Sequence, residues 1–128
     1  MEEVRYMAEY TLDDSILETV RKLVGGEANG EAFDQDLIVH INTVFGILNQ
    51  LGVGPAETFF IVDSSSKWSD FISESMFRPC LSYMVLRVRL LFDPPSNSFV
   101  TSAITDEIRE IEWRLTVQHD EAVDALKS

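Results

Sequence analysis

The sequence predicts an all-α protein, a compact bundle of four to five helices, and three observations lead to this class. Apolar residues recur at intervals of three and four over most of the chain, which is the spacing of one face of an α-helix. Glycines and prolines interrupt this pattern where one apolar stretch gives way to the next. With 128 residues, 45% of them apolar and 25% charged, the chain has the size and composition of one domain with its own core.

The first two helices are expected on either side of a polar, glycine-containing loop. Residues 11–24 form the first, with Thr11 and Asp14 as an acidic variant of a capping box. Asp34 is expected to cap the second, and Gly52 to end it. The apolar positions of the first are Ile16, Leu17, Val20, Leu23 and Val24, and those of the second are Leu37, Ile38, Ile41, Val44, Phe45, Leu48 and Leu51.

A long loop is expected over residues 53–66, because Gly54 and Pro55 continue the break after the second helix. The run Phe59 to Val62 inside this loop is strongly apolar. It either pairs as a short strand or buries against the helices, since a short apolar run has no diagnostic period. Ser66 is then expected to cap a short helix that holds Trp68, Phe71 and Ile72.

The fourth helix is predicted to be the central one, because its apolar stripe is the widest in the chain. Pro79 suits its first turn, where the missing N–H has no helical partner in any case. Asp93-Pro94-Pro95 ends it, since each proline disfavours helical geometry in the preceding residue. Its stripe consists of Leu81, Met84, Val85, Leu86, Val88, Leu90, Leu91 and Phe92.

A fifth helix follows the proline corner, with Ser96 or Ser98 as its expected cap. Its apolar residues are Phe99, Val100, Ala103, Ile104, Ile108, Ile111 and Leu115, opposite a charged face. The predicted organisation is therefore a flexible N-terminal arm at 1–10, a helical domain at 11–118, and an acidic C-terminal tail at 119–128.

The net charge of −12 is unevenly distributed along the chain. Residues 1–36 hold ten acids and three bases, and residues 106–128 hold seven acids and three bases, whereas the middle is nearly neutral. Binding to nucleic acid or to anionic membranes needs clustered Lys and Arg, so the composition argues against both. The N-terminus lacks an apolar signal core and no window resembles a membrane span, so we expect a soluble, unexported protein.

No residue pattern predicts catalysis, a metal or a cofactor. His40 and His119 stand far apart without metal-binding spacing, and Cys80 is the only cysteine. Cys80 is expected to be buried packing and His40 a half-buried structural residue. Adjacent carboxylates, such as those of Glu110 and Glu112, are better explained by an exposed helix face than by acid–base chemistry. We therefore expect no enzyme.

Three of the ten basic residues, Arg78, Arg87 and Arg89, gather on the fourth helix. They either neutralise the acidic helices beside them or form ion pairs with another subunit. The sequence favours neither interpretation.

Three stretches together resemble the head-tail connector proteins of long-tailed bacteriophages, the small adaptors that complete the head beneath the portal. They are INTVFGILNQLGVGP at 41–55, LRVRLLFDPPSNSFV at 86–100 and EWRL at 112–115, with WSDF at 68–71 between them. The similarity spans about residues 12 to 118 and is greatest to versions from phages and prophages of Gram-positive bacteria.

The resemblance implies a structural virion protein made in the host cytoplasm and located in the phage neck. It implies a ring, commonly of twelve copies, that leaves a DNA channel and contacts the portal protein on one side and the adjacent neck or tail-completion protein on the other. A closed ring needs two different contact surfaces on each copy. The loop and the central stripe are candidates for them. The candidate interface residues are Val53, Pro55, Phe59, Phe60, Arg78, Arg87, Arg89 and Trp113.

The charge of −12 suggests a second hypothesis, a small acidic phage regulator that binds a host protein, with DNA mimicry as one form of it. Mimicry would need carboxylates at phosphate-like intervals along an exposed face. Because the apolar stretches carry the resemblance, the connector is the leading hypothesis.

Overall fold

The computed structural model describes residues 9–127, and for residue 27 and residues 118–127 only the backbone. Four α-helices follow one another along residues 16–127: α2 (Ile16–Val24), α3 (Asp34–Gln50), α4 (Glu74–Phe92) and α5 (Ser98–Lys127). Short 3-10 helices lie at Gly26–Asn29, Glu31–Phe33 and Trp68–Asp70, and no strand forms in the described part. The predicted all-α class and compact helical architecture are therefore confirmed.

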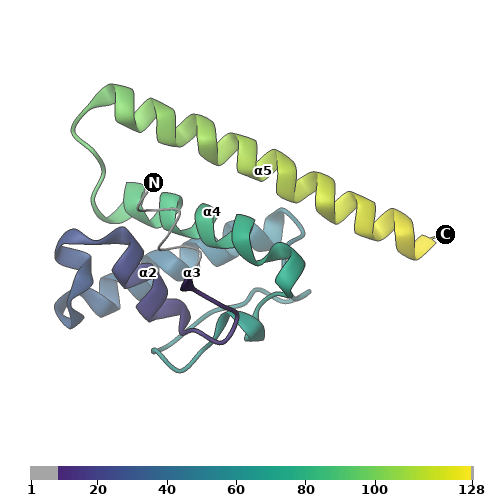
Figure 1. Ribbon diagram of the computed structural model, residues 1–128, viewed down its shortest axis with the longest axis horizontal. Helices are drawn as coiled ribbons and strands as arrows, with labels where there is room; N and C mark the ends of the chain where they lie inside the picture. The colour runs from purple at the N-terminus through teal and green to yellow at the C-terminus, as the bar shows by residue number, and fades with distance from the viewer. Residues whose placement is uncertain (1–8, 128) are drawn as a thin grey trace.

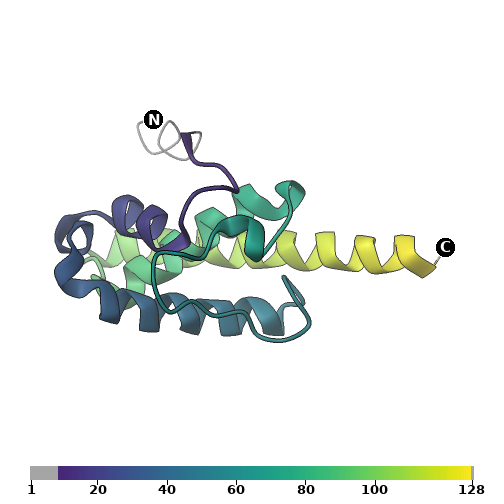
Figure 2. The same cartoon turned by 90° about the horizontal axis from the view of Figure 1, so that it is seen from below.

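Helix α4 is the centre of the molecule, as its wide stripe predicted. It packs against α2, α3 and α5, whose contacts cover different sides of it (Figure 1). Helix α5 runs alongside α4, and its far end continues beyond the rest of the chain (Figures 1 and 2). Most of the stripe of α4 is therefore buried within the chain, whereas Leu91 remains 45% exposed. The expectation that this stripe offers a surface to another subunit stays a prediction.

Helix α2 begins later than expected, because Ser15 and not Thr11 caps it. The Ser15 side chain accepts a hydrogen bond from the backbone N–H of Glu18. The Thr11 N–H still donates to Asp14 Oδ2 at 2.7 Å, so the predicted pair forms a turn before the helix. Residues 1–8 of the predicted arm lie outside the described residues, and Tyr10 packs against the core.

The loop over residues 53–66 is fixed to α3 by several hydrogen bonds, among them those from Asn49 to the carbonyls of Pro55 and Ala56 at 3.3 Å. After α3, Gly52 takes a positive φ of 83°, and the Val53 N–H donates to the Leu48 carbonyl at 2.9 Å, which turns Val53 into the core. Farther along, Asn42 donates to the Ile61 carbonyl at 2.9 Å and accepts from the Ile61 N–H at 2.8 Å. Of the two alternatives for the apolar run, burial against a helix holds for Ile61 and in part for Phe59, whereas Phe60 and Val62 are exposed.

The start of α4 differs from the prediction at Pro79. The helix begins at Glu74, so Pro79 lies inside it. Its ring nitrogen carries no hydrogen, which leaves the Ser75 carbonyl without its usual helical donor. The preceding 3-10 turn is capped at Lys67, whose backbone N–H donates to Asp70 Oδ2 at 2.9 Å, rather than at Ser66.

The proline corner separates α4 from α5 as predicted, but the cap of α5 is Asn97. Its Oδ1 accepts the backbone N–H of Phe99 at 2.8 Å, a role that was expected of Ser96 or Ser98. The amphipathic stripe fades near Gln118, yet the backbone remains helical through Lys127. The segment predicted as an acidic tail therefore continues α5.

Candidate functional site

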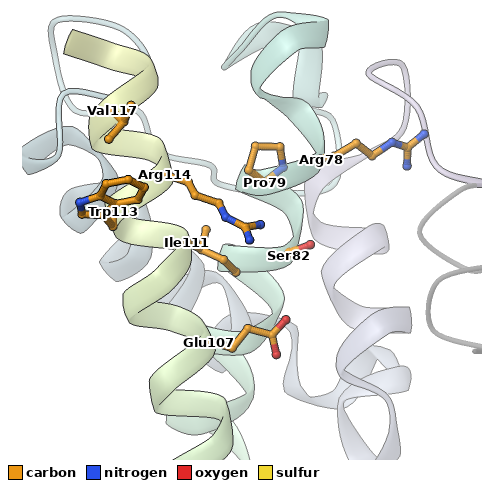
Figure 3. A pocket seen from close by; sticks show the side chains of 8 residues that line it. All are labelled: Arg78, Pro79, Ser82, Glu107, Ile111, Trp113, Arg114 and Val117. Atoms are coloured by element: carbon orange, nitrogen blue, oxygen red, sulfur yellow. The ribbon is translucent and has the colours of Figure 1, made fainter. Parts of the chain in front are cut away.

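A groove lies between the N-terminal half of α4 and the middle of α5, and we call it the α4–α5 groove (Figure 3). It encloses about 570 Å³ and is open to solvent. The residues that line it are Arg78, Pro79 and Ser82 from α4, and Glu107, Ile111, Trp113, Arg114 and Val117 from α5.

The groove combines apolar side chains with two arginines. Trp113 is 67% exposed at its edge, a large apolar group without cover in the described chain. The guanidinium of Arg78 lies 5.0 Å from the centre of the Phe77 ring. Arg114 pairs with Glu110 one helical turn earlier, at 2.6 Å, and both side chains remain mostly exposed. With Glu107 also in the lining, the groove offers apolar surface together with charges of both signs.

A three-residue clamp of Tyr83, Arg87 and Glu112 fastens α5 to α4. Glu112 Oε2 accepts from the Tyr83 hydroxyl at 2.6 Å and from Arg87 NH2 at 2.8 Å, while Arg87 Nε donates to the Tyr83 oxygen at 3.2 Å. Partial burial opposes ionisation of Glu112, but these hydrogen bonds outweigh it and lower its pKa. Burial and the bond to Glu112 raise the pKa of Tyr83. The charge of Arg87 is thus neutralised within the chain. This agrees with the first of the two interpretations of the three arginines, neutralisation of acidic groups on a neighbouring helix.

A second apolar surface, the loop patch, consists of Val39, Phe60 and Val62. Their exposed fractions are 62%, 65% and 66%. The Asn42 bonds bury Ile61 against α3, and because side chains alternate along an extended segment, the residues on either side of it face outward. Val39 precedes Asn42 by about one helical turn and so belongs to the same side of α3.

A bidentate ion pair holds α2 against the start of α3 beside the loop patch. Arg21 Nε donates to Asp34 Oδ1 at 3.0 Å, and Arg21 NH2 to Asp34 Oδ2 at 2.7 Å. The hydrogen bonds that Arg21 donates to Asp34 raise the pKa of Arg21, against the opposing effect of burial. A polar cavity of about 250 Å³ lies here, and Val62 is one of its lining residues. The ion pair therefore braces the helices that support the patch.

The predicted interface residues do not form one cluster. Arg78 and Trp113 both line the α4–α5 groove, but their side chains point to opposite sides of it (Figure 3), and Phe60 belongs to the loop patch. Phe59 is half-buried with its ring 5.0 Å from Phe45 and 5.3 Å from Phe71, so it supports the loop from beneath. Of the other candidates, Pro55 is exposed, Arg87 belongs to the clamp, and Arg89 is partly exposed in the last turn of α4.

Val53 requires a correction, because only 3% of it is exposed. The turn at Gly52 places it under the loop, so it is core and not surface in this fold.

Several groove and patch residues were not among the sequence candidates. Val39 looks like a core residue in the sequence, Val62 is considered only as the end of the apolar run Phe59 to Val62, and Glu107, Arg114 and Val117 look like an ordinary solvated helix face. The one usable signal was Val39, which stands beside the main stripe of α3 rather than in it.

The chemistry of the described residues gives no reactive centre. Cys80 is completely buried, and its burial raises the thiol pKa to about 12, so the thiol stays protonated at neutral pH. Among these residues no three metal-ligating side chains converge. Within the same range, no helix is both long and apolar enough to cross a bilayer.

An all-α body with exposed apolar surfaces and no reactive centre among the described residues is typical of proteins that act through contacts with other proteins. The sequence profile of the phage connector protein family matches residues 16–122. The chain belongs to that family, and the head-tail connector resemblance is confirmed. It is therefore a structural protein of the phage neck. No curated protein and no solved structure matches the chain significantly.

Proposed function

We propose that this protein forms a ring in the neck during head completion, joining the portal protein to the next neck or tail-completion protein and leaving a channel for DNA. Membership of the phage connector family is the observation that carries this proposal. The two exposed apolar surfaces support it by offering more than one contact site on each copy.

A ring of identical subunits uses heterologous contacts, in which one surface of a copy meets a different surface of the next. The α4–α5 groove and the loop patch are such a pair of different surfaces. Because α4 packs between α3 and α5, the patch on α3 and the groove beside α5 belong to separate sides of the subunit. A subunit of this kind can contact two neighbours at once.

The charge of the chain supports a channel that lets DNA pass without adhering to it. Asp106, Glu107 and Glu110 are exposed on α5, in a protein with a net charge of −12. Acidic groups repel the phosphate backbone and release no counterions from it. This suits a conduit better than a DNA-reading protein.

The proposal is tested on purified phage particles that carry the gene in active form. Mass spectrometry is expected to find the protein in washed particles, and antibody labelling in electron microscopy to place it at the head-tail junction. Particles that are infectious and lack the protein would overturn the proposal.

A matched pair of variants tests the loop patch. Phe60→Ser removes a 65% exposed ring from the patch, whereas Phe99→Ser removes an 84% exposed ring outside both surfaces. We expect Phe60→Ser to yield heads without tails and Phe99→Ser to yield normal particles. Equal yields from both variants would remove the loop patch from the proposal.

The regulator hypothesis has less support, because arginines interrupt the acidic face of α5. Glu110 pairs with Arg114 and Glu112 with Arg87, so the carboxylates do not form a uniform phosphate-like row. Affinity capture from infected cells separates the two functions. Recovery of the portal protein supports the neck role, and recovery of a host DNA-binding protein instead supports the regulator.

A further inference from the structure

The loop patch of Val39, Phe60 and Val62 lies beside an acidic cavity. From the Asn42 bonds, the loop runs back along α3 toward the start of that helix and toward α2 (Figure 2). Val62 belongs to both features, because it is 66% exposed and also lines the polar cavity of about 250 Å³. One continuous surface therefore combines large apolar groups with charged ones.

The charge of this cavity is not compensated by the described residues that line it. Four of them are acidic and one is basic: Glu18, Glu31, Asp34, Asp63 and Arg21. Arg21 is committed to Asp34 through two hydrogen bonds. Three carboxylates therefore remain without a basic partner among the lining residues. A positive charge that entered the cavity would be partly shielded from water, where Coulomb attraction is stronger than in bulk solvent.

The exposed face of α3 adds a further carboxylate next to the patch. Asp36 is exposed and precedes Val39 by three residues, so the two side chains are neighbours on the helix surface. Apolar groups with charged groups around them have the composition of a protein interface, in which a dry centre is surrounded by a polar rim. The surface thus calls for a partner that is apolar at its centre and basic at its edge.

A second copy of this chain is a poor match for such a surface. The chain has 22 acidic and 10 basic residues, and Arg21, Arg87 and Arg114 are already paired with carboxylates of their own chain. We propose that the loop patch binds a basic, partly apolar segment of a different protein of the phage neck, with one Lys or Arg side chain of that segment in the acidic cavity.

This inference rests on the proposed function, because the portal protein and the adjacent neck or tail-completion protein are then within reach. It assigns the loop patch to a contact between different proteins, whereas the α4–α5 groove remains for contacts between copies. The cavity has room for the end of one basic side chain, since its volume is several times the share of about 30 Å³ that a water molecule has in the liquid.

Photo-cross-linking from position 60 in assembled particles identifies the occupant. Phe60 is replaced by p-benzoylphenylalanine, which keeps an aromatic ring in the patch and bonds to a neighbouring C–H group on irradiation. Phe99, which is 84% exposed outside the patch, is replaced in the same way as a control. Mass spectrometry of the digested particles then gives the sequence of each linked peptide.

We expect position 60 to link to a peptide of a different virion protein that contains more Lys and Arg than Asp and Glu. Position 99 should not yield this peptide. A linked peptide from a second copy of this chain would overturn the inference, and so would an acidic peptide or the same peptide from both positions. Particles without any link from position 60 would show that nothing covers the patch, which also overturns it.

Titration of the isolated protein with the linked peptide, made synthetically, measures the two parts of the surface. The Kd is expected to rise about fivefold in Glu18→Gln/Glu31→Gln, because two partly screened charge pairs are lost. In Phe60→Ser it should rise about tenfold or more, since an aromatic anchor is removed. No binding by the natural chain would contradict the inference.

The matched control is Asp106→Asn/Glu107→Gln, which removes the same charge from exposed positions of α5. Its Kd should equal that of the natural chain. Thermal unfolding followed by circular dichroism should be similar for all variants, so that a change in Kd reports contact and not folding. Equal weakening by both double variants would mean that only the net charge matters, and the acidic cavity would have no role.

Failure of this inference is distinguishable from failure of the proposed function. If the protein is present at the head-tail junction and position 60 links to a second copy, the neck role stands and the inference alone is overturned. If infectious particles lack the protein, both are overturned.

Discussion

The body formed by residues 11–92 and the helix α5 are built in contrasting ways. The body closes on itself: α2, α3 and α4 contact one another, and the loop over residues 53–66 is tied down at Val53 and Ile61. Helix α5 contacts mainly α4 and is reached through the Asp-Pro-Pro corner. The difference indicates that the body maintains the fold, while many described side chains of α5 are exposed to solvent.

The largest loss of stability is expected from Phe45→Ala in the body. Phe45 is 1% exposed, and its ring lies 4.7 Å from that of Phe71. Removing a buried ring costs about 3–5 kcal/mol of unfolding free energy. Urea denaturation followed by circular dichroism measures this, with the exposed Phe99→Ala as control. A similar small loss in both variants would contradict the contrast between core and surface.

A smaller effect is expected from Gly54→Ala in the loop. Gly54 has a φ of +90°, and an added Cβ would overlap the ring of Phe71, which is buried. Strain of this kind costs about 1–3 kcal/mol. Gly30→Ala is the matched control, because Gly30 has an ordinary φ and open space around it. The loop would not be fixed to the body if both variants unfolded at the same urea concentration.

The attachment of α5 is expected to weaken in Glu112→Gln by about 1 kcal/mol, because a charge-assisted bond to Arg87 is lost. Hydrogen exchange measured by mass spectrometry should rise more in α5 than in α2 and α3. Glu110→Gln, which alters an exposed pair, is the control and should cost less than about 0.5 kcal/mol. Uniform exchange changes over the whole chain would mean that α5 and the body unfold as one unit.

The same clamp predicts a pH dependence with a definite sign. Because the folded chain lowers the pKa of Glu112, the unfolded chain binds its proton more readily. The stabilisation is complete above the ordinary glutamate pKa of about 4.3 and is lost as the pH falls through the lower folded-state value. The urea midpoints of the natural chain and Glu112→Gln should therefore converge as the pH is lowered progressively below about 4.3. A difference that stays constant into acid would exclude the clamp as its source.

The smallest effect on stability is expected from Trp113→Ala, because the indole is 67% exposed. The unfolding free energy should change by less than about 0.5 kcal/mol. Incorporation into phage particles should nevertheless fall, since an exposed aromatic group at a groove suits an interface anchor. Normal incorporation measured by quantitative mass spectrometry would show that Trp113 is not an interface residue.

The sequence predicted the helices well because their signals are local. The 3.6-residue period identified the stripes of α3, α4 and α5, and the proline corner was placed correctly. The start of α4 was missed because Pro79 suggested a first turn, whereas the tertiary contacts of Phe77, completely buried next to Trp68, keep the preceding turn helical. Packing overrode the preference of a single residue.

The candidate site was predicted less well, because its signals are not local. Phe59, Phe60 and Val62 are nearly equivalent in the sequence, and only the Asn42 bonds to Ile61 decide which of them face outward. Similarly, a groove between two helices depends on how they cross. The chemistry of single residues indicated Arg78 and Trp113 as candidates but could not show that both line one groove.

Because α5 is unbroken, its length determines the direction in which its C-terminal end points. Each residue inserted between Leu115 and Lys127 would turn the tip by about 100° and advance it by about 1.5 Å. Seven residues would restore the original direction to within about 20°. Insertions in this helix should therefore keep the direction of its C-terminal end only when they add close to whole turns. Insertions in the loop over residues 53–66 have no such requirement.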